Sequence, residues 1–332
     1  MSKTKIAVLA PDKWFLTSFD EVSCKKLMGM GWSGNTIGDT PTADIVCSAI
    51  KNADVAITSW DSIPFTTAIL DNAPKLGLIC HGAGTVKSLV CDEVWERNIR
   101  VTSAASAIAI GVGEHSLGLM LSAMKNVYEF NRCMKANLPV IQQRSRIVEI
   151  YGITVGVVGC GMTGRRFIEL LKPFEVNIVA FDPFMTKEKA AQLGVGKVEL
   201  DELMSRSHVV ALHAPRLPET KHLINRNNLK LLRDDAMIVN TASGWLIDEE
   251  ALIDELKRRP IIAALDVTFP EPPTADSELR KLPNVILTPH IAGVAANNRF
   301  RIGNLVLREI ERFVSNQLQL YPVFEKDLAK IA

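Results

Sequence analysis

The sequence lacks the features that mark nucleic-acid-binding, membrane and secreted proteins. Its 38 Lys and Arg residues balance 37 Asp and Glu residues, and the net charge is +1, which favours neither nucleic acid nor an anionic membrane surface as a partner. No uninterrupted apolar run reaches the roughly 18 residues of a membrane span. The apolar stretch near the N-terminus is too short for a signal peptide. We therefore expect a cytoplasmic protein with no membrane partner.

The six cysteines include no CxxC pair, so the sequence offers little support for zinc binding or thioredoxin-type chemistry. We predict no metal site and six free thiols, most of them buried. Cys160 lies inside a glycine-rich turn, where a small side chain is needed.

Short apolar runs alternate with helix-compatible segments along the whole chain of 332 residues, whose length is typical of about two domains. Because these runs are apolar throughout, we expect parallel strands buried on both faces, and hence an α/β fold. The predicted strands are 5–10, 54–58, 76–80, 99–103, 153–159, 176–181, 208–213, 236–241, 261–267 and 284–288. The predicted helices are 18–30, 65–72, 112–132, 163–172, 248–258 and 295–316. Composition predicts loops at 31–41 and 270–283.

A glycine motif, Gly159-x-Gly161-x-x-Gly164, follows one of these strands and opens a helix. That context is the one in which the motif binds a dinucleotide. The first glycine permits a tight turn, the second lets the backbone approach a pyrophosphate, and the third lets the helix pack closely on the strand. The N-terminus of the helix offers free N–H groups and the positive end of its dipole to the phosphates.

Asp182 ends the next predicted strand, 21 residues after Gly161. A carboxylate at that spacing accepts hydrogen bonds from a ribose 2′-hydroxyl and repels a 2′-phosphate. The next basic residue is Lys187. We therefore predict NAD as the cofactor rather than NADP.

Two loops, at 264–273 and 287–293, follow predicted parallel strands and contain Glu271 and His290. Ligands of such folds bind at the carboxyl ends of the strands. Hydride transfer to a carbonyl needs a group that protonates the oxygen, and histidine suits this task because it titrates near neutrality. A carboxylate behind the imidazole fixes its tautomer.

At these loops the sequence resembles the D-isomer-specific 2-hydroxyacid dehydrogenase family, which includes phosphoglycerate dehydrogenase and the glyoxylate and hydroxypyruvate reductases. The resemblance covers roughly residues 76–316 in order. Its further motifs are GAG at 82–84, GEHSLGLMLS from Gly113, HAPRLPETKHLIN from His213 and NTASGWLIDEEAL from Asn240.

The resemblance implies an NAD-dependent enzyme in which His290 is the general acid/base and Glu271 its partner. It implies a Rossmann-type doubly wound NAD domain, residues 111–296, inserted into a flavodoxin-like substrate domain, residues 1–110 plus 297–332, with a cleft that closes between them. It also implies a homodimer formed through the helix at 112–132. The substrate is a small 2-oxo or 2-hydroxy acid. The implied cofactor contacts are Gly159, Gly161, Met162, Thr163, Gly164, Asp182, Ala214, Pro215, Thr220, Thr241, Ala242, Asp266 and Gly293. The implied or candidate substrate contacts are His81, Gly82, Ala83, Gly84, Lys87 and Arg216.

One residue departs from the family motif N-x-A-R-G, because Ser243 occupies the position of the arginine that clamps the substrate carboxylate. Serine cannot form a bidentate charge-assisted pair. Three interpretations remain open. In the first, Arg216 or Lys87 supplies the missing cation. In the second, the substrate differs or binds weakly through backbone donors and Ser243. In the third, the protein binds NAD but catalyses little or nothing. The last interpretation defines the alternative function, a catalytically weak or inactive NAD(H)-binding sensor or interaction protein.

Overall fold

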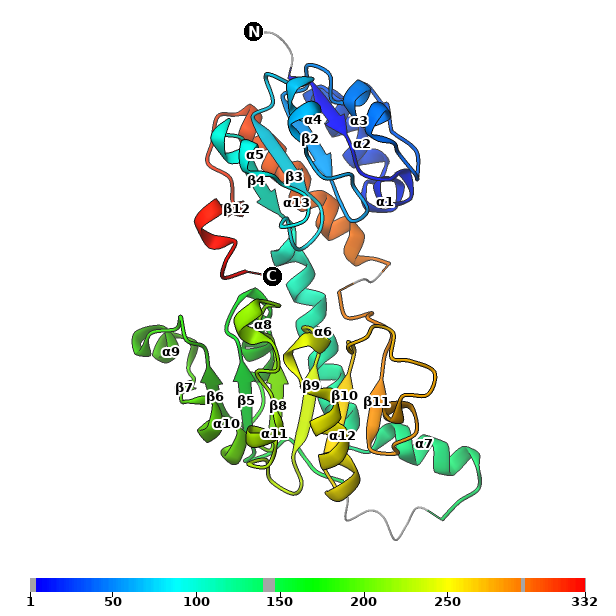
Figure 1. The fold of residues 1–332 in the computed structure, drawn as a ribbon, viewed down its shortest axis with the longest axis vertical. Coiled ribbons are helices and arrows are strands. Elements are labelled where there is room, and N and C mark those ends of the chain that lie inside the picture. The colour runs from blue at the N-terminus through cyan, green and yellow to red at the C-terminus, as the bar shows by residue number, and fades with distance from the viewer. Residues whose placement is uncertain (1–3, 140–146, 294–295, 332) are drawn as a thin grey trace. The chain divides into compact units, whose positions relative to one another are not determined.

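The computed structural model describes residues 4–139, 147–293 and 296–331, which form two compact units. Unit 1 comprises Met1–Ile108 and Val294–Ala332, and unit 2 comprises Ala109–Gly293. Each unit is built on its own sheet (Figure 1).

Unit 1 contains a five-stranded sheet in the order β1–β2–β3–β4–β12. The first four strands are parallel, and β12 pairs antiparallel with β4. The strands are β1 (Ile6–Val8), β2 (Val55–Thr58), β3 (Leu78–His81), β4 (Arg100–Ser103) and β12 (Pro322–Val323).

Successive side chains of these strands enter two separate cores, because strand residues alternate between faces. The helices are, on one face, α1 (Asp12–Ser18), α2 (Glu21–Met30) and α13 (Asn298–Val314), and on the other α3 (Ala43–Ala49), α4 (Thr67–Asp71) and α5 (Asp92–Glu96). Val55 and Ile57 pack against helices α1, α2 and α13 on one face of the sheet, whereas Ala56 packs against α3, α4 and α5 on the other face.

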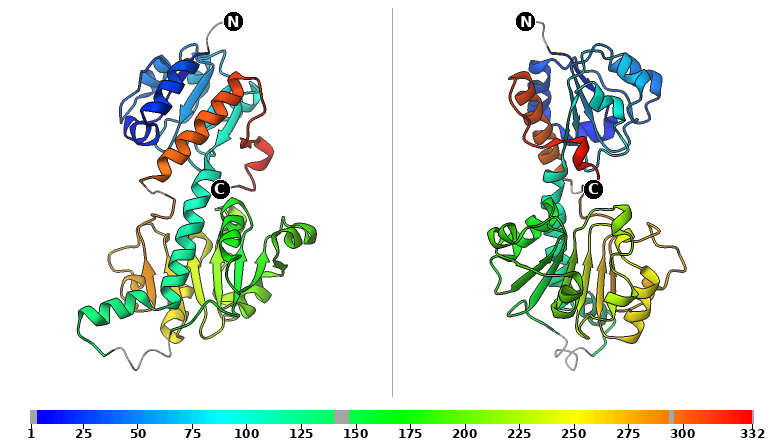
Figure 2. Two further views of the ribbon diagram at one scale, coloured as in Figure 1. Left: turned by 180° about the vertical axis from the view of Figure 1, so that it is seen from behind. Right: turned by 60° about the vertical axis from the view of Figure 1, so that its left-hand side comes forward.

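Unit 2 contains a seven-stranded parallel sheet in the order β11–β10–β9–β8–β5–β6–β7, covered by helices on both faces (Figure 2). The strands are β5 (Thr154–Val158), β6 (Asn177–Phe181), β7 (Gly196–Lys197), β8 (Val209–Leu212), β9 (Met237–Asn240), β10 (Ile262–Leu265) and β11 (Val285–Leu287). The helices of one face are α6 (Ala105–Met124), α8 (Met162–Leu171) and α9 (Lys187–Leu193), and those of the other are α10 (Leu200–Arg206), α11 (Arg226–Leu229) and α12 (Glu249–Arg258).

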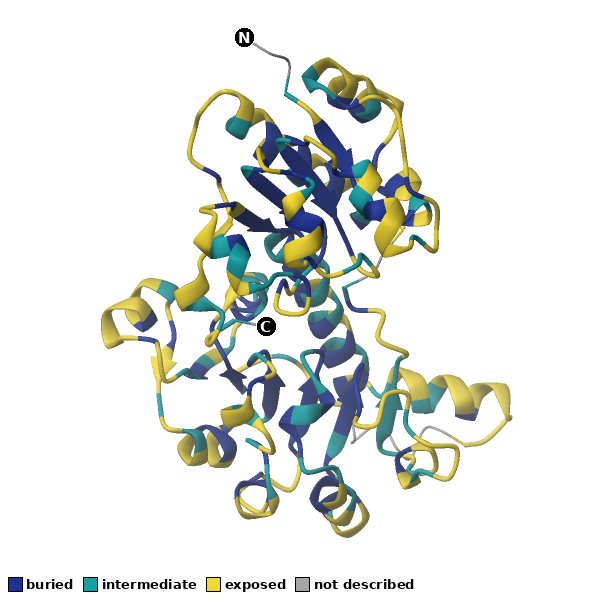
Figure 3. Cartoon of the chain, turned by 45° about the horizontal axis from the view of Figure 1, so that its top comes forward, coloured by how far each residue is buried: buried dark blue, intermediate teal, exposed yellow. Residues whose placement is uncertain are grey.

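The strand order of unit 2 reverses at β5, which lies between β6 and β8. Connections leave the carboxyl ends of these strands in opposite directions, and such a reversal is where open α/β sheets bind their ligands. The central strands β5, β8, β9 and β10 are almost entirely buried, as the dark blue in Figure 3 shows, whereas the edge strand β7 is exposed and β11 is partly buried. The sheet therefore acts as a rigid frame for the loops at its carboxyl edge.

The structure confirms the α/β fold, and each of the ten predicted strands is present with ends shifted by a few residues. The predictions missed β7 and β12, which have two residues each, and the short helices α1, α3, α5, α9, α10 and α11. The predicted helix at 18–30 is wrong in its start, because Asp20 caps α2 by accepting from the N–H of Ser23.

The single helix predicted at 112–132 is also wrong. The structure has α6, which already begins at Ala105, and a separate α7 (Val127–Lys135). Asn126 separates the two helices, with a left-handed backbone (φ 52°) that asparagine tolerates better than most residues. The apolar periodicity continues across this break, so the pattern gave no sign of it.

Helix α6 is long and apolar enough, by length and composition alone, to cross a membrane. Its residues Leu119, Met120 and Ala123 are buried in the core of unit 2. Part of its apolar surface is therefore buried by packing inside the unit.

All six cysteines are free. Three are buried (Cys80, Cys133 and Cys160), and three are partly buried (Cys24, Cys47 and Cys91). Burial raises the pKa of the Cys160 thiol to about 12, which keeps it protonated and unreactive near neutrality.

Candidate active site

The glycine turn joins β5 to α8, and two of its three glycines are required by the protein's own packing. Gly159 has φ 91°, and a Cβ there would lie 2.6 Å from the backbone nitrogen of Ala214. A Cβ at Gly164 would lie 2.0 Å from the carbonyl oxygen of Gly159. At Gly161, by contrast, a Cβ would meet no atom of the described residues within 4 Å. The absence of a side chain at Gly161 thus leaves space that this chain does not use for packing, as a bound pyrophosphate requires.

The N-terminus of α8 lies directly after this turn. Gly161 is its N-cap residue and provides no capping side chain, so the first N–H groups of the helix, those of Met162 and Thr163, face outward without a side-chain cap. The ten-residue helix adds the positive end of its dipole. These groups fit the phosphates of a dinucleotide.

Asp182 follows β6 and is held beside the glycine turn. Its carboxylate accepts hydrogen bonds from the backbone N–H of Cys160 at 2.8 Å and of Phe184 at 2.8 Å. Each carboxylate oxygen keeps a second lone pair for a ligand hydroxyl. The carboxylate therefore suits a ribose with free hydroxyls.

The predicted cofactor residues after β8 and β9 lie at the same edge of the sheet. Ala214 and Pro215 follow β8, and the hydroxyl of Thr220 closes a local turn by donating to the carbonyl of Pro215 at 2.7 Å. Thr241 and Ala242 follow β9. Ser116 of α6 donates its hydroxyl hydrogen to its own helix at Val112, so Thr241 must donate to Ser116 across the 2.7 Å separation of their oxygens.

His213, the residue after β8, is buried next to the glycine turn against the ring of Phe167. Burial lowers its pKa to about 3, and neither ring nitrogen has a hydrogen-bond partner among the described residues. Its imidazole is therefore uncharged near pH 7.

Asp266, the residue after β10, is completely buried and organises the neighbouring loop. It accepts hydrogen bonds from the hydroxyl of Thr288 and from the backbone N–H groups of Ile291 and Ala292. Burial raises the pKa of Asp266, but hydrogen bonds from His115, Thr288 and the two backbone N–H groups outweigh it and lower the pKa to about 2. The carboxylate is thus ionised at all physiological pH values, and the loop that ends at Gly293 is fixed to it.

His290 pairs with Glu271 at this loop. Its Nδ1 forms a short hydrogen bond with Oε1 of Glu271. Because a carboxylate only accepts, Nδ1 carries the hydrogen, and Nε2 is left to exchange a proton with a ligand. The imidazole is 60% exposed, and its backbone adopts the left-handed region with φ 53°, which few residues other than glycine occupy.

Ser243 and its neighbours form a tight turn after β9. The buried side chain of Asn240 accepts from the N–H groups of Ala242 and Ser243 and donates to the carbonyl of Ser243 at 2.9 Å. The hydroxyl of Ser243 accepts from the N–H of Trp245 at 3.3 Å and so caps a short 3-10 helix. A Cβ at Gly244 would lie 2.1 Å from the backbone carbon of Thr268, so only glycine fits there.

Of the remaining predicted residues, Arg216 lies in unit 2 after β8, and the others lie in unit 1, at the end of β3 and in the loop that follows it. The carbonyls of Ala83 and Gly84 accept from the hydroxyl of Ser103, and a Cβ at Gly82 would overlap the ring of Trp14. Lys87 donates from Nζ to the carbonyl of Ile331 at 2.6 Å.

His81, which ends β3, is buried, and its Nδ1 forms a 3.0 Å hydrogen bond with the hydroxyl of Thr58. Burial lowers the pKa of His81 to about 4. The side chain therefore stays neutral at physiological pH.

The sequence patterns missed two residues that shape this site, His115 and Glu249. His115 lies with Nε2 3.5 Å from Asp266 and 3.3 Å from Thr288, whose own hydrogen already goes to Asp266, so Nε2–H is the donor. Glu249 accepts from the backbone N–H of Phe269, at the start of the loop that carries Glu271. No sequence pattern reveals such contacts, because the partners are distant in the chain.

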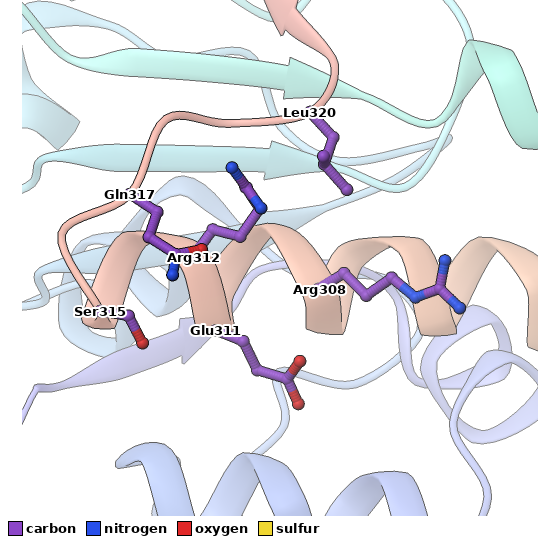
Figure 4. A pocket seen from close by; sticks show the side chains of 6 residues that line it. All are labelled: Arg308, Glu311, Arg312, Ser315, Gln317 and Leu320. Atoms are coloured by element: carbon purple, nitrogen blue, oxygen red, sulfur yellow. The ribbon is translucent and has the colours of Figure 1, made fainter.

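A surface depression of about 250 Å³ lies at the C-terminal end of α13 in unit 1 (Figure 4). It is lined by Arg308, Glu311, Arg312, Ser315, Gln317 and Leu320. It contains none of the predicted site residues.

Several known proteins are similar to this chain. Residues 117–292 match the family model described as "D-isomer specific 2-hydroxyacid dehydrogenase, NAD binding domain". The chain is 35% identical over 279 residues to D-3-phosphoglycerate dehydrogenase of Methanocaldococcus jannaschii, a match covering 83% of this chain and 53% of that protein. It is 28% identical to glyoxylate reductase of Korarchaeum cryptofilum, covering 84% and 85%. The chain thus spans about half the length of several phosphoglycerate dehydrogenases that it matches.

Solved structures share the fold. The apo form of D-mandelate dehydrogenase from Rhodotorula graminis superimposes with a TM-score of 0.83 at 22% identity, covering 97% of this chain and 98% of that chain. Apo D-lactate dehydrogenase from Escherichia coli gives a TM-score of 0.69 at 24% identity, covering 97% and 100%.

Proposed function

The chain belongs to the D-isomer-specific 2-hydroxyacid dehydrogenase family, and from that membership we propose that it interconverts a 2-oxo acid and a D-2-hydroxy acid with NAD(H). The domain that matches the family is its NAD-binding domain, so the cofactor is a nicotinamide dinucleotide. The pairing of His290 with Glu271, at the same edge of the sheet as the glycine turn, is the observation that carries the proposal.

His290 acts as the general acid/base. When bound, a nicotinamide supplies or accepts the hydride at the substrate carbon. In the reductive direction Nε2–H of the imidazolium donates its proton to the carbonyl oxygen, and the imidazole becomes neutral. Glu271 holds the ring through Nδ1 and stabilises its charged form, so that Nε2 faces the reaction in both directions.

We propose that unit 2, Ala109–Gly293, holds the cofactor and that unit 1 contributes to substrate binding. The N–H groups of Met162 and Thr163 would bind the pyrophosphate, and Asp182 the ribose hydroxyls, which favours NAD over NADP. The backbone N–H groups of the loop at 81–85 would bind the substrate carboxylate.

The chain would act as a cytoplasmic homodimer assembled through α6 and α7. Three apolar side chains of α7 are strongly exposed, namely Val127 (49%), Tyr128 (46%) and Met134 (67%). Burial of such a patch by a second copy would stabilise the dimer.

A second function is favoured by one observation, the capping role of Ser243 where the family has arginine. In this alternative the chain binds NAD(H) with little or no turnover, and its conformation depends on whether the bound cofactor is oxidised or reduced.

The experiment that separates the two functions is a substrate panel. The purified protein is incubated with NADH, and in parallel with NADPH, and with glyoxylate, hydroxypyruvate, pyruvate or branched 2-oxo acids. Turnover that His290→Ala abolishes, and that His222→Ala at an exposed histidine preserves, supports the enzyme. Tight NADH binding without turnover on any substrate would support the sensor instead.

A further inference from the structure

We propose that Arg216, mounted on the ring of Trp245, binds the substrate carboxylate in place of the arginine that the chain lacks at position 243. The inference rests on the proposed function, because it assigns the anchor for a 2-oxo acid at that site. It assigns no role in proton transfer to Arg216, which is a binding and orienting residue.

Ser243 does not fill this role itself. Its hydroxyl accepts from the N–H of Trp245, and its backbone groups are engaged by Asn240. A hydroxyl also has no charge with which to balance a carboxylate, so at best one neutral hydrogen bond remains available.

Trp245 is fixed firmly enough to serve as a support. Its Nε1–H donates to the carbonyl of Leu217 at 2.9 Å, and its ring meets that of Phe269 edge to face, at 5.5 Å and 87°. The backbone of the loop after β8 also bonds to it, since the N–H of His222 donates to the carbonyl of Trp245 at 3.0 Å. The loop of Arg216 and the turn of Ser243 are thereby joined.

Arg216 lies over this aromatic pair. Its guanidinium carbon is 5.0 Å from the centroid of Trp245 and 5.9 Å from that of Phe269. Trp245 is two residues after Ser243, and Phe269 is two residues before Glu271. The cation is therefore held between the turn that lacks an arginine and the loop that supports the acid/base histidine.

A guanidinium that stacks through its face keeps its N–H groups free at the edge. Arg216 is exposed, and no carboxylate of residues 4–139, 147–293 or 296–331 forms an ion pair with it. The planar fork can thus bind a carboxylate bidentately, and the stack lowers the entropy lost on binding because the side chain is already positioned.

Two other cations are less suited. Lys87 already donates to the carbonyl of Ile331. Lys221 lies 4.9 Å from the centroid of the same tryptophan ring, but no contact with Phe269 accompanies it, and an ammonium has no fork. Lys221 carries the same charge on the same ring and therefore provides a matched control.

The test compares Arg216→Gln with Lys221→Gln in the full chain. Three quantities are measured: the dissociation constant of NADH, kcat/KM for glyoxylate and hydroxypyruvate, and the dissociation constant of oxamate for the NADH complex. Oxamate presents the carboxylate and carbonyl of a 2-oxo acid but is not reduced. Arg216→Gln should raise the oxamate constant and lower kcat/KM by about 10- to 100-fold, as expected for lost hydrogen bonds to a charged group. Both variants should retain the NADH constant of the wild type.

A second variant, Arg216→Gln combined with Ser243→Arg, should recover at least part of the oxamate affinity, because it restores a guanidinium near the same carboxylate. Equal losses in Arg216→Gln and Lys221→Gln, or no loss in either, would overturn the assignment while leaving the proposed function intact. If the wild type shows no turnover but binds oxamate, and Arg216→Gln weakens that binding, the role of Arg216 as carboxylate anchor is supported and the proposed reaction is rejected. A wild type that neither turns over nor binds oxamate would overturn both.

Discussion

The carboxylate of Asp266 accepts a hydrogen bond from the backbone N–H of Ala292 at 2.9 Å, and so ties the residue after β10 to the loop that carries His290. Together with the hydrogen bonds that Asp266 accepts from Thr288 and Ile291, this bond fixes the position of the backbone from which the His290 side chain extends. The position of His290, the proposed acid/base group, therefore depends on a buried charge that does not itself need to touch the substrate.

Asp266→Asn should weaken the hydrogen bonding that holds the His290 loop in place, because an amide offers one acceptor oxygen where the carboxylate offers two. We expect a loss of about 1–3 kcal/mol in unfolding free energy, as for other broken buried hydrogen bonds to a charge, together with lower kcat. Chemical denaturation and steady-state kinetics test this. Asp276→Asn, at an exposed aspartate, is the control, and an Asp266→Asn protein with wild-type stability would contradict the prediction.

Glu271→Gln should lower kcat while leaving NADH affinity unchanged. The glutamine keeps the size of the side chain but no longer stabilises the charged imidazole through Nδ1. A loss of roughly 10- to 100-fold is expected for an effect transmitted through the acid/base group. The control is Glu278→Gln, which should retain full activity. Glu278 is an exposed glutamate that lies after the same loop and pairs with Lys257. Equal activities in the two variants would remove Glu271 from the mechanism.

Two alanine substitutions in the glycine turn should have opposite effects. Gly161→Ala meets no atom of the described residues, so the protein should keep its melting temperature and lose NADH affinity by about tenfold or more. Gly159→Ala introduces both a clash with Ala214 and an unfavourable φ, and should lower stability by roughly 1–3 kcal/mol. Thermal melts and NADH titrations measure both, and unchanged NADH affinity in Gly161→Ala would exclude the turn as the pyrophosphate site.

Acid should destabilise the protein partly through His81. Burial lowers the pKa of His81 to about 4 in the folded protein, whereas the unfolded chain takes up this proton near pH 6.5. The contribution to stability is therefore complete above pH 6.5 and falls as the pH decreases toward 4, by about 3 kcal/mol in total.

His81→Asn should flatten the slope of unfolding free energy against pH in that window, as measured by denaturation at several pH values. His222→Asn, at an exposed histidine, serves as the comparison. If the unfolding free energies of the wild type and His81→Asn change equally with pH, His81 does not contribute to the acid sensitivity of the fold.

Met134→Lys should weaken self-association, because it places a charge in the exposed apolar side of α7. Light scattering after size exclusion should show a dimer for the wild type and a larger monomer fraction for the variant. Lys135→Ala, the neighbouring charged residue, should leave the dimer intact. A monomeric wild type would refute the proposed assembly.

The sequence by itself determined the strands and the glycine turn, because both depend on short-range patterns. A run such as residues 153–159 is apolar enough to be buried on both faces, and Gly159 and Gly164 are spaced for one strand-to-helix turn. The break at Asn126 escaped the same reasoning, since the apolar periodicity of the helix continues across it.

The family resemblance already paired His290 with Glu271, but only the tertiary structure decided which other side chains meet. Trp245 and Leu217 are 28 residues apart in the chain, and Asp266 and Ala292 are 26 apart, yet each pair forms a hydrogen bond. The parallel sheet brings the carboxyl ends of successive strands to one edge, and the loops that follow them then select their partners by shape and hydrogen bonding. Such contacts have no local periodicity, so the support of Arg216 by Trp245 and the anchoring of the His290 loop by Asp266 became visible only in the folded chain.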